Sequence, residues 1–274
     1  MFGLAILFGC IVGFALGLTG GGGGVLAVPL LVYGMSIAPR EAVGISLAAV
    51  GGTAFFGTVP RLIRGEVEIR TGLLFAIAGM LGAPLGTYLS TLIPEQVLLT
   101  MFAVLMLFVA FRMWSKASNP KIASGVCNSE TQVDRDRSAC QRDADGTLRL
   151  TSRCARLLVI VGLMTGVLSG MFGVGGGFVI VPALVLFSGM AIHRAVGTSL
   201  LVIVLVSISG VTSHVISGNA LSLETTVQFL LGGFAGMWLG GIVAKRLKGP
   251  TLQKTFSIAV VLIALFVLIK SAVS

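Results

Sequence analysis

Charged residues are scarce in this chain, and their scarcity indicates its class. Lysine, arginine, aspartate and glutamate make up 11% of 274 residues, while 55% are hydrophobic; a soluble domain carries roughly 25% charged residues. The apolar residues form runs of the length, about 17 to 25 residues, that an α-helix needs to cross a bilayer. The clearest runs are 42–59, 71–93, 96–111, 195–217, 225–244 and 255–269. Because they do not alternate with period two, we predict an all-α polytopic membrane protein.

Acidic and metal-ligating residues are missing from these runs. No Asp or Glu lies within a clear run, which argues against a carboxylate proton relay or a multi-carboxylate cation site and favours an anion as cargo. Of the four cysteines, Cys127, Cys140 and Cys154 lack zinc-ligand spacing, and Cys10 fits a packing role. We therefore expect neither a metal nor a cofactor. The net charge of +9 is explained by cytoplasmic loops, so we expect a lipid bilayer and no nucleic acid as partner.

Two parts of the sequence repeat each other. Residues 13–47 align without a gap with residues 166–200, so that Gly22–Gly24 match Gly175–Gly177. The segment between the repeats is polar and basic, and its composition is too polar to bury a core, so we predict a flexible cytoplasmic linker. The chain then divides into a first transmembrane repeat, 1–114, the linker, 115–153, and a second transmembrane repeat, 154–274.

The basic loops change sides between the repeats. With the linker inside, the 60–70 loop is inside and basic, whereas its counterpart 217–224 has no Lys or Arg, and the loop after that one contains Lys245, Arg246 and Lys248. This pattern predicts inverted repeats related by an axis in the membrane plane. Each repeat then has a Gly-broken first segment, whose two arms enter and leave on one side, plus three transmembrane helices. Single crossings by residues 2–35 and 155–190 would instead make the repeats parallel.

Glycine runs break the first segment of each repeat. Consecutive glycines hold a helix together poorly, and broken backbone at membrane depth needs protein or a water-filled cavity to satisfy it. Helices that begin just after Gly24 and Gly177 would direct free N–H groups and a positive dipole end at an anion. Nearby hydroxyls would donate to an oxyanion or, alternatively, to carbonyls of their own helix. The predicted substrate-binding residues are Gly20, Gly21, Gly22, Gly23, Gly24, Ser46, Gly173, Gly175, Gly176, Gly177, Thr198 and Ser199.

Other glycines and the two histidines have simpler interpretations. His193 and His214 occupy the places of Arg40 and Arg61 in the repeat, so each repeat keeps a cationic residue there. Solvated helix ends explain this pattern, and His214 is also the candidate for proton coupling. Glycine pairs four residues apart are typical of close helix packing. We assign to packing the pairs Gly13 and Gly17, Gly82 and Gly86, Gly166 and Gly170, and Gly236 and Gly240.

The combined motifs resemble a known family. The pattern G-L-x-G-x-G-G-G followed by Pro, then A-V-G-T-S-L and G-x-x-x-G, resembles the sulfite exporter TauE/SafE family of membrane permeases, also called TSUP, over roughly residues 3–113 and 155–270. The resemblance implies a secondary transporter that moves a small sulfur-containing anion, such as sulfite or an organosulfonate, across the bacterial inner membrane by alternating access. Thr19, Gly20 and Gly21 depart from the family's usual alternating pattern.

Several alternatives remain open at this stage. The cargo is a sulfur anion or another small anion such as a carboxylate, and an anion channel or a sensor would share the same features. An intramembrane hydrolase using Ser199 with His193 or His214 is disfavoured because the sequence lacks a G-x-S-x-G elbow. The sequence leaves open the direction of transport, the coupling ion and whether the protein is a homo-oligomer.

Overall fold

Every regular element is helical within residues 2–118, 152–188, 190, 192–218, 222–244, 258 and 260–270, the part of the chain that the computed structural model describes. The first half contains α1 Phe2–Thr19, η1 Gly22–Leu26, α2 Ala27–Pro29, η2 Leu30–Gly34, α3 Pro39–Ile63, α4 Ile69–Leu92 and α5 Glu95–Ser118. The second half contains α7 Ser152–Phe172, α8 Gly177–Ser188, α9 Ile192–Ile216 and α10 Leu223–Ala244. A further helix covers residues 260–270.

The helices confirm an all-α polytopic membrane protein. Among the described residues, five helices are long and apolar enough to cross a membrane: Pro39–Ile63, Ile69–Leu92, Ala155–Phe172, His193–Ile216 and Leu223–Val243. Large apolar side chains such as Leu81 and Trp238 are about two-thirds exposed, at 66% and 67%, which suits a face in contact with lipid. The predicted linker is described only at its two ends, and Lys245, Arg246 and Lys248 also lie outside the described residues.

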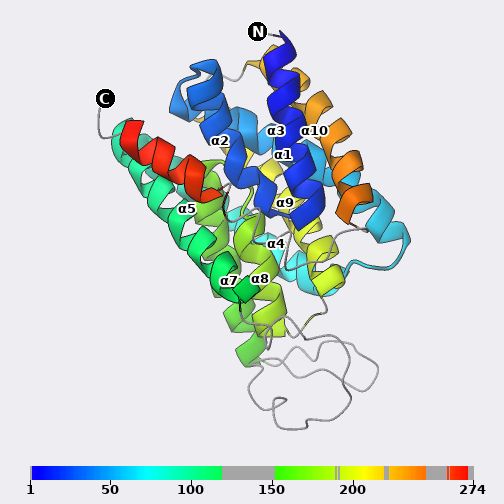
Figure 1. The fold of residues 1–274 in the computed structure, drawn as a ribbon. Helices are drawn as coiled ribbons and strands as arrows, with labels where there is room; N and C mark the ends of the chain where they lie inside the picture. Colours follow the sequence, from blue (N-terminus) through cyan, green and yellow to red (C-terminus); the bar gives the residue numbers. More distant parts are fainter. Residues whose placement is uncertain are drawn as a thin grey trace.

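Two close helix pairs join one half of the chain to the other. Helix α1 packs along α10 (Figure 1), and α4 packs along α7. Gly13 lies against the backbone of Gly233 and Gly17 against Met237, so α1 and α10 run in the same direction. The predicted packing role is confirmed for all eight glycines, because a β-carbon at any of them would meet the backbone of the partner helix. These residues are Gly13, Gly17, Gly82, Gly86, Gly166, Gly170, Gly236 and Gly240.

Helices α3 and α9 cross each other in the opposite sense. Gly51 of α3 lies beside Ser207 of α9, while Leu47 lies beside Gly210 and Gly57 beside Leu200. Residue numbers therefore increase along α3 as they decrease along α9, so the two helices are antiparallel. Since α3 and α9 occupy equivalent places in the repeat, this arrangement is the one that an axis in the membrane plane requires. It supports the predicted inverted repeats.

The broken first segments fold back on themselves at the glycines. Gly23 lies against the backbone of Val12 to Leu16 in α1, and Gly34 lies against the ring of Phe8, so residues 22–34 run back along α1. In the second half, Gly176 lies against Thr165 of α7. One detail of the prediction is wrong: helical structure in the first half begins at Gly22 and not just after Gly24. The second arm, α8, begins at Gly177, one residue before the predicted start.

Candidate functional site

The two glycine runs meet between the two halves of the chain. Gly21 of the first run lies against the backbone of Gly177, and Gly24 lies against Val174. These two contacts are equivalent under the repeat, because Gly21 corresponds to Val174 and Gly24 to Gly177. Every residue of Gly20–Gly24 and of Gly173–Gly177 is buried. The structure thus brings the predicted glycines together in one place, which we call the glycine crossing.

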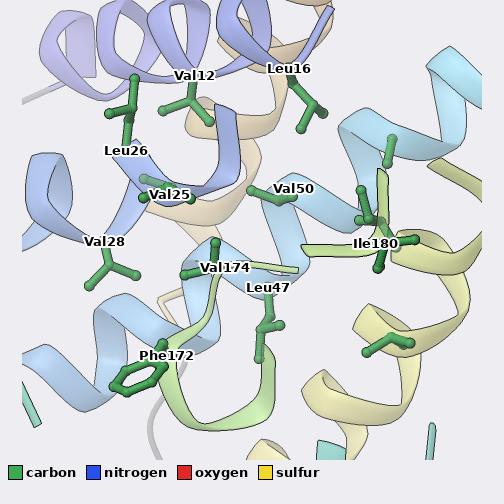
Figure 2. Close-up of a cluster of buried hydrophobic side chains, with 14 of the residues drawn as sticks. Val12, Leu16, Val25, Leu26, Val28, Leu47, Val50, Phe172, Val174 and Ile180 are labelled. Carbon is green, nitrogen blue, oxygen red and sulfur yellow. The ribbon is translucent and has the colours of Figure 1, made fainter. Parts of the chain in front are cut away.

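The glycine crossing is surrounded by apolar side chains from both broken segments and from the helices packed against them. Figure 2 shows Val25 and Val174 from the two broken segments in one cluster with Val50 of α3 and Ile180 of α8. Gly175 is bordered by Val50 and Ile203. With Gly21 and Gly177 in backbone contact, the crossing is closed in this conformation, so a ligand enters only if the two runs separate.

Two serines fasten the runs to the opposite repeat. Ser46 Oγ of α3 donates a hydrogen bond to the carbonyl oxygen of Gly173 (2.5 Å), and Ser199 Oγ of α9 donates to the carbonyl oxygen of Gly20 (2.8 Å). Gly173 and Gly20 have φ of 71° and 72°, a left-handed conformation that favours glycine. A β-carbon there would also meet Val43 or Val196. Both hydroxyls therefore donate to carbonyls in this conformation and hold each run against the other half of the protein.

Removal of the Ser46 or the Ser199 hydroxyl is expected to weaken the packing between the two halves of the chain. Ser46→Ala and Ser199→Ala should each lower the free energy of unfolding by about 1 kcal/mol, because a buried glycine carbonyl loses its donor. Thermal unfolding in detergent measures the loss. The control is Thr212→Ala, since the Thr212 hydroxyl is exposed and donates to Ile208 O of its own helix; its effect should stay within about 0.5 kcal/mol. Equal melting temperatures for all three variants would show that the serine bonds do not hold the halves together.

The structure separates the hydroxyl of Thr198 from the glycine crossing. Thr198 Oγ1 accepts a hydrogen bond from the backbone N–H of Glu68 (3.0 Å) and donates to Met190 Sδ (3.7 Å). Successive residues of a helix point about 100° apart, so Ser199 faces Gly20 while Thr198 faces the start of α4. Thr198 is therefore not brought together with the other predicted binding residues in this conformation.

The two runs differ in how their backbone N–H groups are satisfied. In the first run, Thr19 Oγ1 accepts from the N–H of Gly22 (2.9 Å) and donates to Ala15 O (2.7 Å). Phe172 stands at the place of Thr19 in the second repeat and has no hydroxyl to offer. Within the described residues, the N–H groups of Val174, Gly175 and Gly176 make no hydrogen bond. The second run thus presents three free N–H groups just before the first turn of α8.

Two further serines lie beside the second run, and neither was predicted. Ser169 and Ser207 are 0% and 2% exposed, and their hydroxyls have no hydrogen-bond partner among the described residues. Ser207 Oγ lies 3.9 Å from where a β-carbon on Gly175 would stand, and Ser169 Cβ lies 3.6 Å from the same point on Gly176. Their counterparts in the first repeat are Leu16 and Ala54. Because only one repeat carries these hydroxyls, comparison of the repeats gave no signal for them.

His214 lies apart from the glycine crossing, near the C-terminal end of α9. Its side chain is 1% exposed, and neither ring nitrogen has a hydrogen-bond partner in the described part of the chain. The backbone of Arg40 lies beside it, and the Arg40 guanidinium donates to Thr91 O (3.2 Å). Seven residues separate His214 from Ser207, which corresponds to about 10 Å along a helix.

The chain is similar along nearly its whole length to proteins described as probable membrane transporters. The family model described as Sulfite exporter TauE/SafE matches residues 5–267. A probable membrane transporter protein of Xylella fastidiosa (strain Temecula1) is 34% identical over 270 residues, covering 96% of this chain and 93% of the relative. The probable membrane transporter protein YunE of Bacillus subtilis is 28% identical over 269 residues, covering 96% of this chain and 95% of YunE. No solved structure matches this chain.

Proposed function

Because this chain belongs to the TauE/SafE sulfite exporter family, we propose that it moves a small sulfur-containing anion across the bacterial inner membrane as a secondary transporter. Membership in this family makes it a multi-pass membrane transporter of a small substrate and not an enzyme. The proposed cargo is sulfite or an organosulfonate. In keeping with transport, the one proton of the Ser199 hydroxyl is shared between the carbonyl oxygens of Gly20 and Val196, and its hydrogen-bond partners in the described part of the chain include no histidine.

The observation that carries the proposal is the meeting of the two glycine runs between the repeats. Backbone N–H groups in a helix-breaking run are donors, and the first turn of α8 adds the positive end of its dipole. The sequences of α7, α8 and α9 contain no Asp or Glu, so no carboxylate on these helices opposes a bound anion. Glycine permits the anion to approach the backbone. A site built in this way suits an oxyanion better than a cation.

Alternating access follows from the same geometry. The reciprocal bonds of Ser46 and Ser199 join each run to the opposite repeat, so a rocking of one repeat against the other would move the two runs apart. We propose inverted repeats that expose the glycine crossing to one side of the membrane and then to the other. In this proposal, the closed crossing would be an intermediate between the two openings.

Flux into proteoliposomes tests the proposed function. Purified protein is reconstituted, and uptake of sulfite, ethanesulfonate, sulfate and acetate is followed with and without an imposed proton gradient. The proposal expects saturable uptake of sulfite or ethanesulfonate and accumulation above the external concentration. Uptake that stops at equal concentrations under every imposed gradient would indicate a channel. A preference for acetate would be consistent with a transporter but would contradict a sulfur-containing anion as its cargo.

His214 is proposed as the group that couples transport to protons. Replacement by Gln, His214→Gln, should flatten the dependence of transport on pH, because histidine is the side chain whose charge most readily changes near physiological pH. The backbone of Arg40 on α3 lies beside it, while the Arg40 guanidinium donates to Thr91 O. His193→Gln is the matched control, since His193 is exposed, and it should keep the wild-type profile. A wild-type profile in His214→Gln would remove His214 from the coupling mechanism.

A further inference from the structure

We propose that the anion is held asymmetrically, on the second repeat, by the hydroxyls of Ser169 and Ser207 and the N–H groups of Val174, Gly175 and Gly176. This inference rests on the proposed function and specifies its binding site. The two runs carry glycine at equivalent positions except that Val174 matches Gly21, but the side chains around them differ. The two unpartnered hydroxyls lie beside the second run, and apolar residues take their places in the first repeat.

The unpartnered hydroxyls are the first step of the argument. Burying a hydroxyl without a hydrogen-bond partner is unfavourable, and most buried polar groups therefore have one. Ser169 and Ser207 are almost completely buried and have none among the described residues. Other serines in comparable places are satisfied, since Ser209 on the same helix as Ser207 donates to Met80 O (2.7 Å). A ligand that accepts hydrogen bonds would supply the missing partner.

The free N–H groups are the second step, because they belong to the segment that lies beside these two serines and directly precedes α8. Gly175 faces Ser207 and Gly176 faces Ser169, and the N–H groups of residues 174–176 have no acceptor in the described part of the chain. N–H groups only donate, and a hydroxyl also donates. Three N–H groups on one short segment, together with the two hydroxyls from α7 and α9, suit a ligand with several acceptor oxygens, such as the three oxygens of sulfite or of a sulfonate group.

The contrast with the first run is the third step. There, Thr19 accepts from the N–H of Gly22, and the places of Ser169 and Ser207 are taken by Leu16 and Ala54. Both of those side chains are apolar and buried. Thr19 thus satisfies one N–H group of the first run, that of Gly22, and no serine stands at the two places that carry the unpartnered hydroxyls in the second repeat. The first run forms a wall of the site, while the second run supplies the donors.

The proposed donors lie about halfway along the membrane-spanning helices, which is where a transport site is expected. Ser207 lies beside Gly51, in the middle of α3, where α3 and α9 cross. Gly175 is bordered by Val50 of α3 and Ile203 of α9, so the second run lies at the same level. The proposed donors thus lie where the two halves of the chain meet, at the place that a rocking motion would uncover from either side.

The test compares serine variants of the full-length protein for binding of sulfite and ethanesulfonate. Ser169→Ala and Ser207→Ala should each raise the Kd of the preferred anion by about tenfold or more, as expected for the loss of a hydrogen bond to a charged group. Without ligand, both variants should melt at or above the wild-type temperature, because an unpartnered hydroxyl has been removed. Ser209→Ala is the matched control: it should melt lower, since Met80 O loses its donor, and should keep the wild-type Kd.

Three outcomes decide the inference. A higher Kd in both variants with undiminished melting temperatures supports it. Wild-type affinity in both variants, with anion binding intact, overturns the asymmetric site while leaving the proposed function in place. If the wild-type protein binds neither sulfite nor ethanesulfonate, the proposed function and this inference fail together.

Discussion

A Gly176→Ala variant is expected to insert and fold but to lose transport by on the order of 100-fold. Gly176 has φ of 69°, and a β-carbon there would stand 3.3 Å from Thr165 O and 3.6 Å from Ser169 Cβ. The neighbours need to give by only a few tenths of an ångström, so the protein should fold. The methyl group, however, would stand beside Ser169, on the segment whose N–H groups are proposed donors. Loss of charge-assisted hydrogen bonds of about 1.5 to 3 kcal/mol corresponds to roughly 10- to 150-fold.

The control for backbone strain is Gly65→Ala. Gly65 has φ of 68° and nothing within 4 Å of a β-carbon, so this variant carries the same left-handed strain of about 1 kcal/mol or somewhat more without filling the glycine crossing. Both variants should melt at similarly reduced temperatures, measured in detergent, and only Gly176→Ala should lose flux in proteoliposomes. Equal flux in the two variants would show that Gly176 has no part in binding.

A Gly13→Leu variant is expected to prevent stable folding. A β-carbon at Gly13 would meet the backbone of Gly233 in α10, and backbone atoms cannot rotate out of the way as a side chain can. Because the two helices run in the same direction along their length, relief would require α1 to move away from α10. We expect a loss of at least about 3 kcal/mol, at the upper end for overpacking. Size-exclusion chromatography after detergent extraction should show aggregate or no recoverable protein.

Gly3→Leu provides the comparison on the same helix. Gly3 is exposed and has nothing within 4 Å of a β-carbon, so this variant should elute and melt as the wild type does. Recovery of monodisperse Gly13→Leu protein with the wild-type melting temperature would contradict the packing of α1 against α10.

The helices and the close packing of the paired glycines could be predicted from the sequence. Apolar runs of membrane-spanning length and glycines four residues apart are direct physical requirements of a helical membrane protein. Gly13 and Gly166, for example, both lie against backbone as predicted. The contact between Gly21 and Gly177 could not be predicted in this way, because alignment of the repeats matches the two glycine runs but does not show that they touch.

Side-chain direction and asymmetry account for what the sequence did not reveal. Thr198 and Ser199 are neighbours, yet the helix turns one toward α4 and the other toward Gly20. The early start of helical structure at Gly22 follows from the bond that Thr19 accepts, which has no counterpart in the second repeat. Ser169 and Ser207 became candidates only once the structure showed that their hydroxyls are buried without partners.

Anion-dependent thermal stabilisation tests the central claim, that the glycine crossing binds an oxyanion. Wild-type protein, Gly176→Ala and Gly65→Ala are heated in detergent with sulfite, ethanesulfonate, sulfate or acetate at fixed ionic strength. A ligand at 100 times its Kd adds about 2.7 kcal/mol to the stability of the form that binds it. We predict a selective rise in Tm with sulfite or ethanesulfonate for the wild type and Gly65→Ala, and none for Gly176→Ala. An equal rise in all three proteins, or no rise with any anion, would contradict the claim.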